Sequence, residues 1–306
     1  MKTLALWTLC VGCILSSSCS SPTNTDAVND VSLADPGAYL ISVHDSVDND
    51  SLKRLPTVVA FHGFSASTYE WWEYRDHSDS VGSARVSLPL LGGHGRTYED
   101  FRKATWEDWQ AEPLAEYKAL SDRGYSNLNV VCSSTGCPLL IDAIKHGWFA
   151  DKIAPHHVVM IDPIIFPSAK VLTLVDIAGL VLNSASTECT DTEKSYWFCT
   201  RPVEALNQLQ NVLTYVRGEL EDGVQAPDST QIIVFKSIHD GSADPVSALA
   251  IYQGLRNGDG SHIEVQMVKS SLHVFTRGAG RAKWTTDDEA LQIKTFTEMD
   301  SIFNAR

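Results

Sequence analysis

Residues 130–140 read VVCSSTGCPLL, and this stretch decides how the rest of the chain is interpreted. The run NLNVVC at 127–132 has the apolar, β-branched composition of a buried strand, and CPLLIDAIKHG at 137–147 has the composition of a helix. Two serines, a threonine and a glycine lie between them. A strand, a sharp turn with a central serine and a helix are the context in which a serine can be held exposed as a nucleophile.

The turn leaves two serines to choose between. Aligned on Gly136, a small-x-Ser-x-Gly pattern runs over residues 132–136 and makes Ser134 central, while Ser133 is out of register. Small residues are needed two positions before and after the nucleophile, because backbones approach closely there. Gly136 meets this need fully and Cys132 partly. Taken alone the match is weak, because clusters of Ser, Thr and Gly are usually plain loops.

Partners for a serine nucleophile lie further along the chain. Such a serine needs a base to take its proton and a carboxylate to orient the base. Asp240 and Asp244 follow the predicted strand 231–238, and His273 follows the predicted strand 263–268. An aspartate before a glycine is often only a turn former, and a loop histidine is often only a surface residue. Their joint occurrence after strands predicts a Ser-His-Asp triad with either aspartate as the acid.

Strands and helices alternate along most of the chain, which predicts an α/β fold with a mostly parallel sheet covered on both faces. Between about residues 164 and 227 this alternation stops, and helix-like segments without a strand predict a small inserted helical cap. The other strands are expected at 38–43, 57–64, within 84–95 and at 157–163, and the other helices at 105–124, 245–255 and 288–303.

The predicted strand 57–64 ends in a turn that contains His62, Gly63 and Phe64. The backbone N–H of Phe64, together with that of Thr135, is predicted to form an oxyanion hole beside Ser134. His62 and His94 each lie in a glycine turn, so we expect both to be structural.

These motifs together resemble the bacterial carboxylesterase and monoacylglycerol lipase branch of the α/β-hydrolases. The resemblance covers roughly residues 57–303, and it departs from the family at Cys132, where glycine is usual. It implies an α/β-hydrolase fold with a small cap and favours Asp240 over Asp244 as the acid of the triad. The motifs that carry it are HGF at 62–64, GHG at 93–95, the turn at 132–136, HDGSADPVSA at 239–248 and SSLHV at 270–274.

Four of the seven cysteines lie beyond residue 19. Cys189 and Cys199 bracket a short loop of the cap and are predicted to form a disulfide, which in the loop-entropy account stabilises the fold by roughly 2–3 kcal/mol. Cys132 and Cys137 flank the serine turn. They are expected to be either a small disulfide or, as the sequence slightly favours, two buried thiols. No cysteine or histidine spacing indicates zinc, and no cofactor is expected.

The first 22 residues, MKTLALWTLCVGCILSSSCSSP, have the charge and apolar run of an export signal. The signal resembles that of a bacterial lipoprotein, in which Cys19 is lipidated. Cys13 is a competing site, and plain secretion with cleavage in the serine run is the alternative. A flexible tether is expected at 20–36 and the catalytic domain at 37–306. Lipid anchoring through Cys19 predicts a membrane location, weakly favouring the outer membrane.

The formal net charge of −14 argues against nucleic acid as a partner, because phosphate binding needs a basic face. The predicted reaction is hydrolysis of short-to-medium acyl esters or monoglycerides. A lipase, thioesterase, peptidase or acyltransferase on the same triad, or a non-catalytic binding protein, remains open, as does the oligomeric state. Apolar cap residues that are candidates to line an acyl pocket are Leu172, Leu174, Val175, Ile177, Leu180, Leu182, Tyr196, Trp197 and Phe198.

Overall fold

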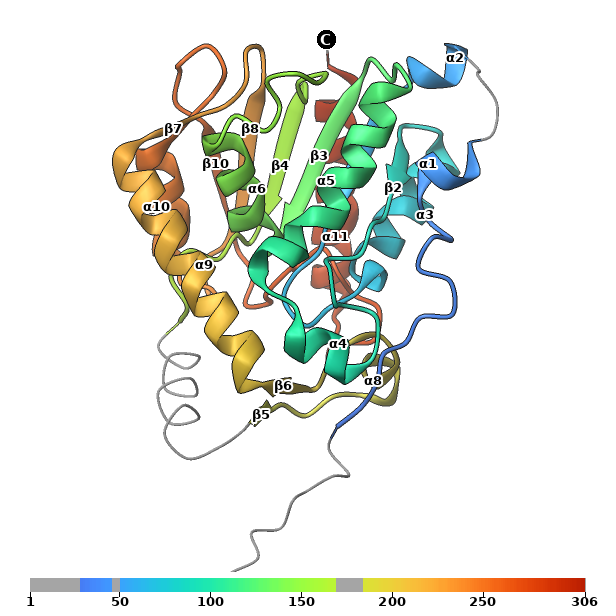
Figure 1. Cartoon of the computed structure of the whole chain (residues 1–306), viewed down its shortest axis with the longest axis vertical. Coiled ribbons are helices and arrows are strands. Elements are labelled where there is room, and N and C mark those ends of the chain that lie inside the picture. The colour runs from blue at the N-terminus through green and yellow to red at the C-terminus, as the bar shows by residue number, and fades with distance from the viewer. Residues whose placement is uncertain (1–27, 46–49, 169–183, 306) are drawn as a thin grey trace, which may run out of the picture.

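The computed structural model describes residues 28–45, 50–168 and 184–305. Its centre is a six-stranded sheet in the order β10-β8-β4-β3-β1-β2 (Figure 1). Every neighbouring pair in it is parallel, which confirms the prediction of a mostly parallel sheet. The strands are β1 Thr57–Phe61, β2 Arg85–Ser87, β3 Leu128–Ser133, β4 His157–Ile161, β8 Gln231–Ser237 and β10 Glu264–Val268.

The central strands are apolar on both faces, as strands covered on both sides must be. Successive residues of β1 point to opposite faces, so Val59 packs in one core cluster and Val58 in the other. The helices α5, α6, α9 and α10 cover the first face, and α3 and α11 cover the second (Figure 1). These helices are α3 Trp72–Val81, α5 Trp106–Asp122, α6 Gly136–Lys145, α9 Val203–Asp222, α10 Val246–Gly254 and α11 Thr286–Asn304.

Helix α5 shows how the sequence sets the ends of a helix. The Thr105 side chain accepts a hydrogen bond from the Asp108 backbone N–H, and the Asp108 carboxylate accepts one from the Thr105 N–H. This capping box provides partners for N–H groups that have none within the helix. At the other end Gly124 has a φ of +79°, a left-handed conformation that glycine adopts readily.

The strand predicted at 38–43 is wrong. The segment instead forms turns and the short helix α1 Ile41–His44, near the edge strand β2. Side chains, rather than a strand, satisfy its backbone: the Ile41 N–H donates to Ser87 Oγ and the Ser42 N–H donates to Glu116. The N–H groups of Ile41 and Ser42 are therefore not available for hydrogen bonds to a neighbouring strand.

The expectation that the cap contains no strand is also wrong in its described part. Strands β5 Ser184–Ser186 and β6 Thr200–Pro202 form a small antiparallel hairpin around helix α8 Asp191–Tyr196. Each strand has only three residues, too few for an apolar alternation to reveal it. The six candidate acyl-pocket residues from Leu172 to Leu182 lie outside the described residues.

The described part of the expected tether is packed against the rest of the protein. Residues 28–36 lie against the catalytic domain instead of extending from it: the Val31 N–H donates to the Arg96 carbonyl, and Asn29 donates to the Trp197 carbonyl of the cap. The predicted signal and Cys19 lie outside the described residues. Among the residues described, no helix is both long and apolar enough to cross a membrane.

The remaining described elements connect these parts. They are the helices α2 Asp50–Lys53 and α4 Tyr98–Lys103, the 3₁₀ helix η2 Thr68–Trp71, and the strand pair β7 Val224–Gln225 and β9 Leu255–Arg256.

Candidate active site

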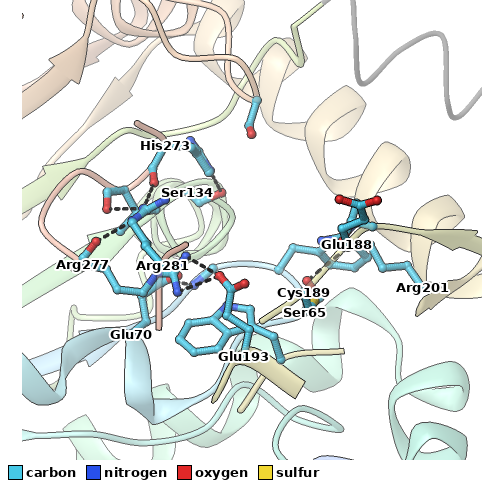
Figure 2. Close-up of a pocket in the computed structure, with 16 residues that line it drawn as sticks. Ser65, Glu70, Ser134, Glu188, Cys189, Glu193, Arg201, His273, Arg277 and Arg281 are labelled. Atoms are coloured by element: carbon cyan, nitrogen blue, oxygen red, sulfur yellow. Dashed lines mark hydrogen bonds and ion pairs between the residues drawn. The ribbon is translucent and has the colours of Figure 1, made fainter. Parts of the chain in front are cut away.

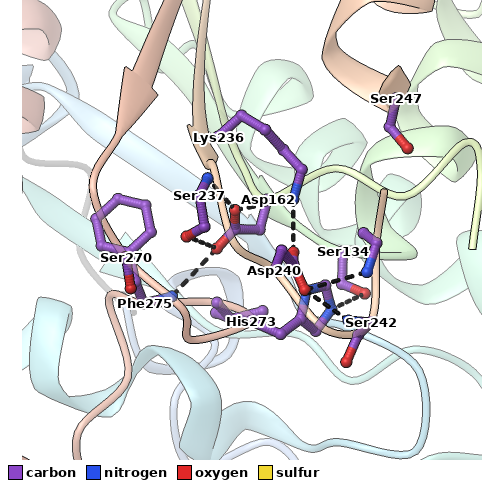
Figure 3. A network of polar contacts seen from close by, with 12 residues as sticks. Ser134, Asp162, Lys236, Ser237, Asp240, Ser242, Ser247, Ser270, His273 and Phe275 are labelled. Carbon is purple, nitrogen blue, oxygen red and sulfur yellow. Dashed lines mark hydrogen bonds and ion pairs between the residues drawn. The ribbon is translucent and has the colours of Figure 1, made fainter. Parts of the chain in front are cut away.

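Ser134, Asp240 and His273 meet at one edge of the sheet. Each follows the carboxyl end of a strand, respectively β3, β8 and β10, and parallel strands bring these ends to the same edge. His273 Nε2 lies 2.7 Å from Ser134 Oγ, and His273 Nδ1 lies 2.8 Å from Asp240 Oδ2 (Figure 3). The structure thus brings together the serine, acid and histidine that the sequence selected.

The turn that carries Ser134 is tight and strained. Ser134 has a φ of +47°, in the left-handed region that a serine rarely adopts. A Cβ at position 136 would lie 2.5 Å from the Phe61 carbonyl oxygen, so only glycine fits there. The structure joins Cys132 and Cys137 in a disulfide across the turn, with a Cα–Cα distance of 5.1 Å. It therefore has the bonded form, which the sequence had ranked below two free thiols.

Ser133 points away from the triad. It is the last residue of β3 and fully buried, and its hydroxyl donates to Glu70 Oε1. The Ser133 hydroxyl also donates to the Phe61 carbonyl, 3.4 Å away. The neighbouring serine is therefore a structural hydrogen-bond donor, and the register aligned on Gly136 places the correct hydroxyl beside the imidazole.

Asp240 is held by more than the imidazole. Its Oδ2 lies 2.5 Å from Lys236 Nζ, and its Oδ1 accepts from the backbone N–H groups of Ser242 and Ala243. Burial alone would raise the pKa of Asp240, but His273 and Lys236 outweigh it and hold the pKa well below its usual value. Asp240 is therefore ionised at neutral pH.

Asp244, the alternative acid, has a different role in the structure. Its Oδ1 accepts from the Val246 N–H, 2.9 Å away, at the start of α10. A carboxylate at a helix start is favoured by the unpaired N–H groups and the positive end of the helix dipole.

A second buried aspartate completes the network, and the sequence analysis missed it. Asp162 follows β4 and accepts from the N–H of Ser237 at 2.7 Å and from Lys236 Nζ at 3.2 Å (Figure 3). The Phe275 N–H also donates to it, at 3.3 Å, which ties the His273 loop to the sheet. A lysine inside the apolar strand IIVFKS was the available sequence signal, because a buried lysine needs an acidic partner.

The two predicted oxyanion donors flank Ser134. In the part of the chain that the structure describes, the N–H groups of Phe64 and Thr135 have no hydrogen-bond acceptor. A Cβ at Gly63 would lie 3.0 Å from Ser134 Cβ, so the loop carrying Phe64 lies directly against the nucleophile. Thr135 immediately precedes α6, where the helix dipole also favours negative charge. Both N–H groups therefore stay candidates for the oxyanion donors.

Comparison with known proteins finds similarity to lipolytic enzymes. No protein-family profile matches the chain. The chain is 25% identical over 223 residues to a curated thermostable monoacylglycerol lipase of Bacillus sp. strain H-257, covering 72% of this chain and 83% of that one. Its fold matches a monoglyceride lipase of Saccharomyces cerevisiae with a TM-score of 0.65 and 11% identity, over 82% of this chain and 87% of the other.

A structure from the study of the metagenome-derived lipolytic enzymes LipS and LipT matches with a TM-score of 0.61 and 20% identity, over 80% of this chain and 93% of that chain. The chain has the α/β-hydrolase fold. In sequence it is similar to a monoacylglycerol lipase.

The loop that carries Phe64 is held by Glu70, which the sequence analysis did not select. Glu70 Oε1 accepts from the Gly63 N–H at 2.7 Å and also from the Ser133 hydroxyl. The buried carboxylate therefore ties the Phe64 loop to the turn that carries the nucleophile. No motif marks this glutamate, because its partners come from two other segments of the chain.

Ser134 and His273 line a charged pocket (Figure 2). Arg277 contacts Glu193 through both terminal nitrogens at 3.1 Å, and Arg201 Nε donates to Ser65 Oγ at 3.2 Å. Burial lowers the pKa of Arg281 to about 10, and its Nε donates to the Arg277 carbonyl. The lining residues are Gly63, Phe64, Ser65, Glu70, Ser134, Thr187, Glu188, Cys189, Glu193, Trp197, Arg201, Ser242, His273, Val274, Arg277 and Arg281.

Of the three aromatic cap residues expected to line an acyl pocket, the described structure places only Trp197 there. Phe198 is buried and stacks on Phe101, with ring centroids 4.4 Å apart. Tyr196 stacks on Tyr69 at 4.0 Å. These two rings join the cap to the main domain. The hairpin carrying them is closed by the disulfide Cys189–Cys199.

His62 and His94 of the hydrolase are structural, in agreement with the expectation. Both are fully buried, and His62 Nε2 accepts from the Leu91 N–H at 2.9 Å. Burial lowers the pKa of His62 to about 4, despite the nearby charge of Glu70. Both imidazoles are therefore neutral at ordinary pH and hold the loops around the oxyanion donors.

Proposed function

We propose that this α/β-hydrolase is a serine carboxylic ester hydrolase acting through Ser134, His273 and Asp240. The observation that carries the proposal is the continuous chain of two short hydrogen bonds from Ser134 Oγ through the imidazole to the Asp240 carboxylate. This is the arrangement that activates a serine hydroxyl as a nucleophile.

The proposed reaction begins with proton transfer. Asp240 accepts the Nδ1–H of His273 and so fixes the tautomer in which Nε2 can take the proton of Ser134 Oγ. Ser134 Oγ then attacks the ester carbonyl, and the N–H groups of Phe64 and Thr135 receive the oxyanion. The imidazolium gives its proton to the leaving alcohol, which leaves an acyl-enzyme.

Hydrolysis of the acyl-enzyme uses the same groups in reverse order. His273 Nε2 takes a proton from water, the hydroxide attacks the acyl carbonyl, and the proton passes to Ser134 Oγ as the acid leaves. Lys236 and Asp162 take no part in bond making. Lys236 keeps the Asp240 carboxylate charged, and Asp162 holds Lys236 in place.

The proposed substrates are short-to-medium acyl esters or monoglycerides. Two relatives are named as monoacylglycerol or monoglyceride lipases, which supports the monoglyceride class. The described pocket adds support for a polar alcohol group, because arginine and glutamate side chains and a serine hydroxyl line it beside Trp197. A glycerol hydroxyl finds both donors and acceptors there.

The test is hydrolysis of p-nitrophenyl esters from acetate to palmitate, with 1-monoacylglycerols of the same chain lengths. We expect Ser134→Ala to lose about 10⁴-fold or more in kcat/KM. The matched variant Ser133→Ala keeps its turnover within about tenfold, because it loses only a structural hydrogen bond. Full activity in Ser134→Ala, or no activity of the intact protein on any ester, would contradict the proposal.

The location at a membrane is a further proposal that rests on the first 22 residues. The apolar run of the signal and the position of Cys19 support export with lipid attachment, and two disulfides suit an oxidising compartment. The test is fractionation of cells that express the full chain. Cys19→Ala should move the protein from the membrane to the soluble fraction, whereas the same change at Cys13 should leave it in place.

A further inference from the structure

A second cluster of ionisable side chains lies away from the catalytic triad, between helices α6 and α9. Asp142 and His146 are one turn apart on α6, and Glu219 faces them from α9. His146 Nε2 lies 2.9 Å from Glu219 Oε1 and 3.5 Å from Asp142 Oδ1. Asp142 is 5% exposed and Glu219 6%, whereas the His146 side chain is 56% exposed.

More oxygens lie near His146 Nε2 than this one nitrogen can hydrogen-bond at the same time. Tyr215 Oη also lies 3.2 Å from His146 Nε2, so three oxygens approach one atom that carries at most one proton. Although Nε2 is 2.9 Å from Glu219, neither buried oxygen of that carboxylate has a hydrogen bond within the described chain. The Oε1 of Gln110, whose amide contacts Asp142, is likewise buried without a partner.

Two buried carboxylates whose oxygens lie within 4.8 Å of each other need positive charge nearby. Burial, and after it the charge of Asp142, raises the pKa of Glu219. The nearby Lys145 does not supply the missing charge directly, because its Nζ donates to the Gly223 carbonyl, 2.8 Å away. An unpaired buried carboxylate costs several kcal/mol in proteins, and bound cations are a common way in which such pairs are kept.

We propose that Asp142, His146 and Glu219 bind a divalent transition-metal ion of the Zn²⁺ type. One imidazole nitrogen and two carboxylate oxygens form a donor set that suits Zn²⁺, whereas Mg²⁺ and Ca²⁺ take oxygen ligands alone. All three donor atoms lie within 4.8 Å of one another. Ligands about 2.0–2.2 Å from a tetrahedral ion are about 3.3–3.6 Å apart, so small movements complete the site.

The surroundings of the cluster have further features of a metal site. Gln110 Nε2 donates to Asp142 Oδ2 at 2.9 Å, which orients the carboxylate and leaves Oδ1 facing the imidazole. A surface cavity lined in part by Gln110, Asp142 and His146 gives an ion access from solvent. The exposed side of His146 leaves space for water as the fourth ligand.

The ion would join two elements that matter to the catalytic site. Helix α6 begins at Gly136, two residues after Ser134, and α9 begins where the cap hairpin ends. Binding to the folded state alone stabilises it by mass action. We therefore assign the site a structural role that holds α9 against α6.

The test uses the full chain after dialysis against EDTA, with ZnCl₂ as the probe. We expect one Zn²⁺ per chain bound at this cluster by equilibrium dialysis, and a rise in Tm of about 5 °C at a hundredfold excess over Kd. Glu219→Gln should lose both effects, while its metal-free form should be at least as stable as the metal-free wild type, because the amide removes the repulsion from Asp142. Glu221→Gln, an exposed change on the same helix, should respond like the wild type.

Several outcomes would overturn the assignment. They are no Zn²⁺ uptake at 100-fold molar excess of the ion, or uptake that Glu219→Gln and His146→Ala leave unchanged. An equal response to Ca²⁺ or Mg²⁺ would also overturn it, because a site with an imidazole ligand discriminates against these ions. Neither variant touches the ester-cleaving residues, so the result is independent of the proposed activity.

Discussion

At the scale of single residues, the charge of Asp240 depends on Lys236 as well as on the catalytic imidazole. The lysine is fully buried and contacts both Asp162 and Asp240, so the network holds two carboxylates and one fixed cation. In this arrangement the aspartate next to His273 stays charged, and a second positive charge on the imidazole is favoured when it forms during the reaction.

The contact of Asp240 with His273 predicts that replacing Asp240 lowers kcat far more than replacing Asp244, four residues later. We expect Asp240→Asn to lower kcat by about 10⁴-fold, because an amide cannot hold the required imidazole tautomer or stabilise its positive charge. Asp244→Asn should keep kcat within about threefold, because an asparagine also accepts hydrogen bonds at a helix start. Steady-state kinetics on one p-nitrophenyl ester measures both. A large loss in Asp244→Asn with an active Asp240→Asn would reverse the assignment.

The buried His94 predicts how stability depends on pH. Burial, and then the charge of His62, lowers the pKa of His94 well below its usual value. The unfolded chain therefore binds a proton at this residue below about pH 6.5 while the folded protein does not, so stability falls as the pH falls. From pH 7 to pH 5 this residue accounts for a loss of about 2 kcal/mol.

The measurement is urea unfolding at pH 7 and pH 5. His94→Phe should show a loss of stability between the two pH values that is smaller by about 2 kcal/mol, since the new ring still packs against Phe64, Phe101 and Trp109. The exposed His262, changed to Ala, is the control and should keep the wild-type loss. Equal losses in His94→Phe and wild type would show that this imidazole is not held neutral.

Sequence reasoning reached the triad but not the residues that support it. Ser134, Asp240 and His273 each follow a strand, and parallel strands bring such positions together whatever the loops between them do. Glu70 and Asp162 contact partners 63 to 113 positions away along the chain. No local pattern marks a contact of that kind.

At the scale of elements, the described cap is closed by a disulfide and held to the main domain by stacked rings. The disulfide Cys189–Cys199 closes a loop with a sequence separation of 10, and this loop carries Glu193 and Trp197 into the pocket. Its hairpin was hidden in the sequence because each strand is short and largely polar. The same reasoning failed at residues 38–43, where side chains of Ser87 and Glu116 bind the backbone that a strand would have used.

The position of the hairpin at the pocket predicts that loss of its disulfide changes KM more than kcat. Cys189→Ser together with Cys199→Ser should raise KM severalfold and leave kcat within about threefold, because the triad lies on the sheet and not on the cap. Unfolding should become easier by about 2–3 kcal/mol in the loop-entropy account. Ester kinetics and urea unfolding test the two parts. A collapse of kcat with unchanged KM would mean that the hairpin positions the triad itself.

At the scale of the whole molecule, the fold concentrates the functional groups at the carboxyl edge of one sheet. The proposed nucleophile, base, acid and first oxyanion donor come from loops after β3, β10, β8 and β1, and helices on both faces bury the strands that fix these loops. The fold class was therefore predictable from the alternation of strands and helices. The order of strands, and the charged lining of the pocket, come from contacts that the alternation does not encode.

The central claim is that this molecule has one activated serine, at position 134. The most direct measurement is labelling with a p-nitrophenyl alkylphosphonate, followed by intact mass and peptide mapping. We predict one phosphonyl group per chain, attached to Ser134, with release of one equivalent of p-nitrophenol. Ser134→Ala should take up none and Ser133→Ala should label as the wild type does. A label on Ser133, or no label on the intact protein, would contradict the account.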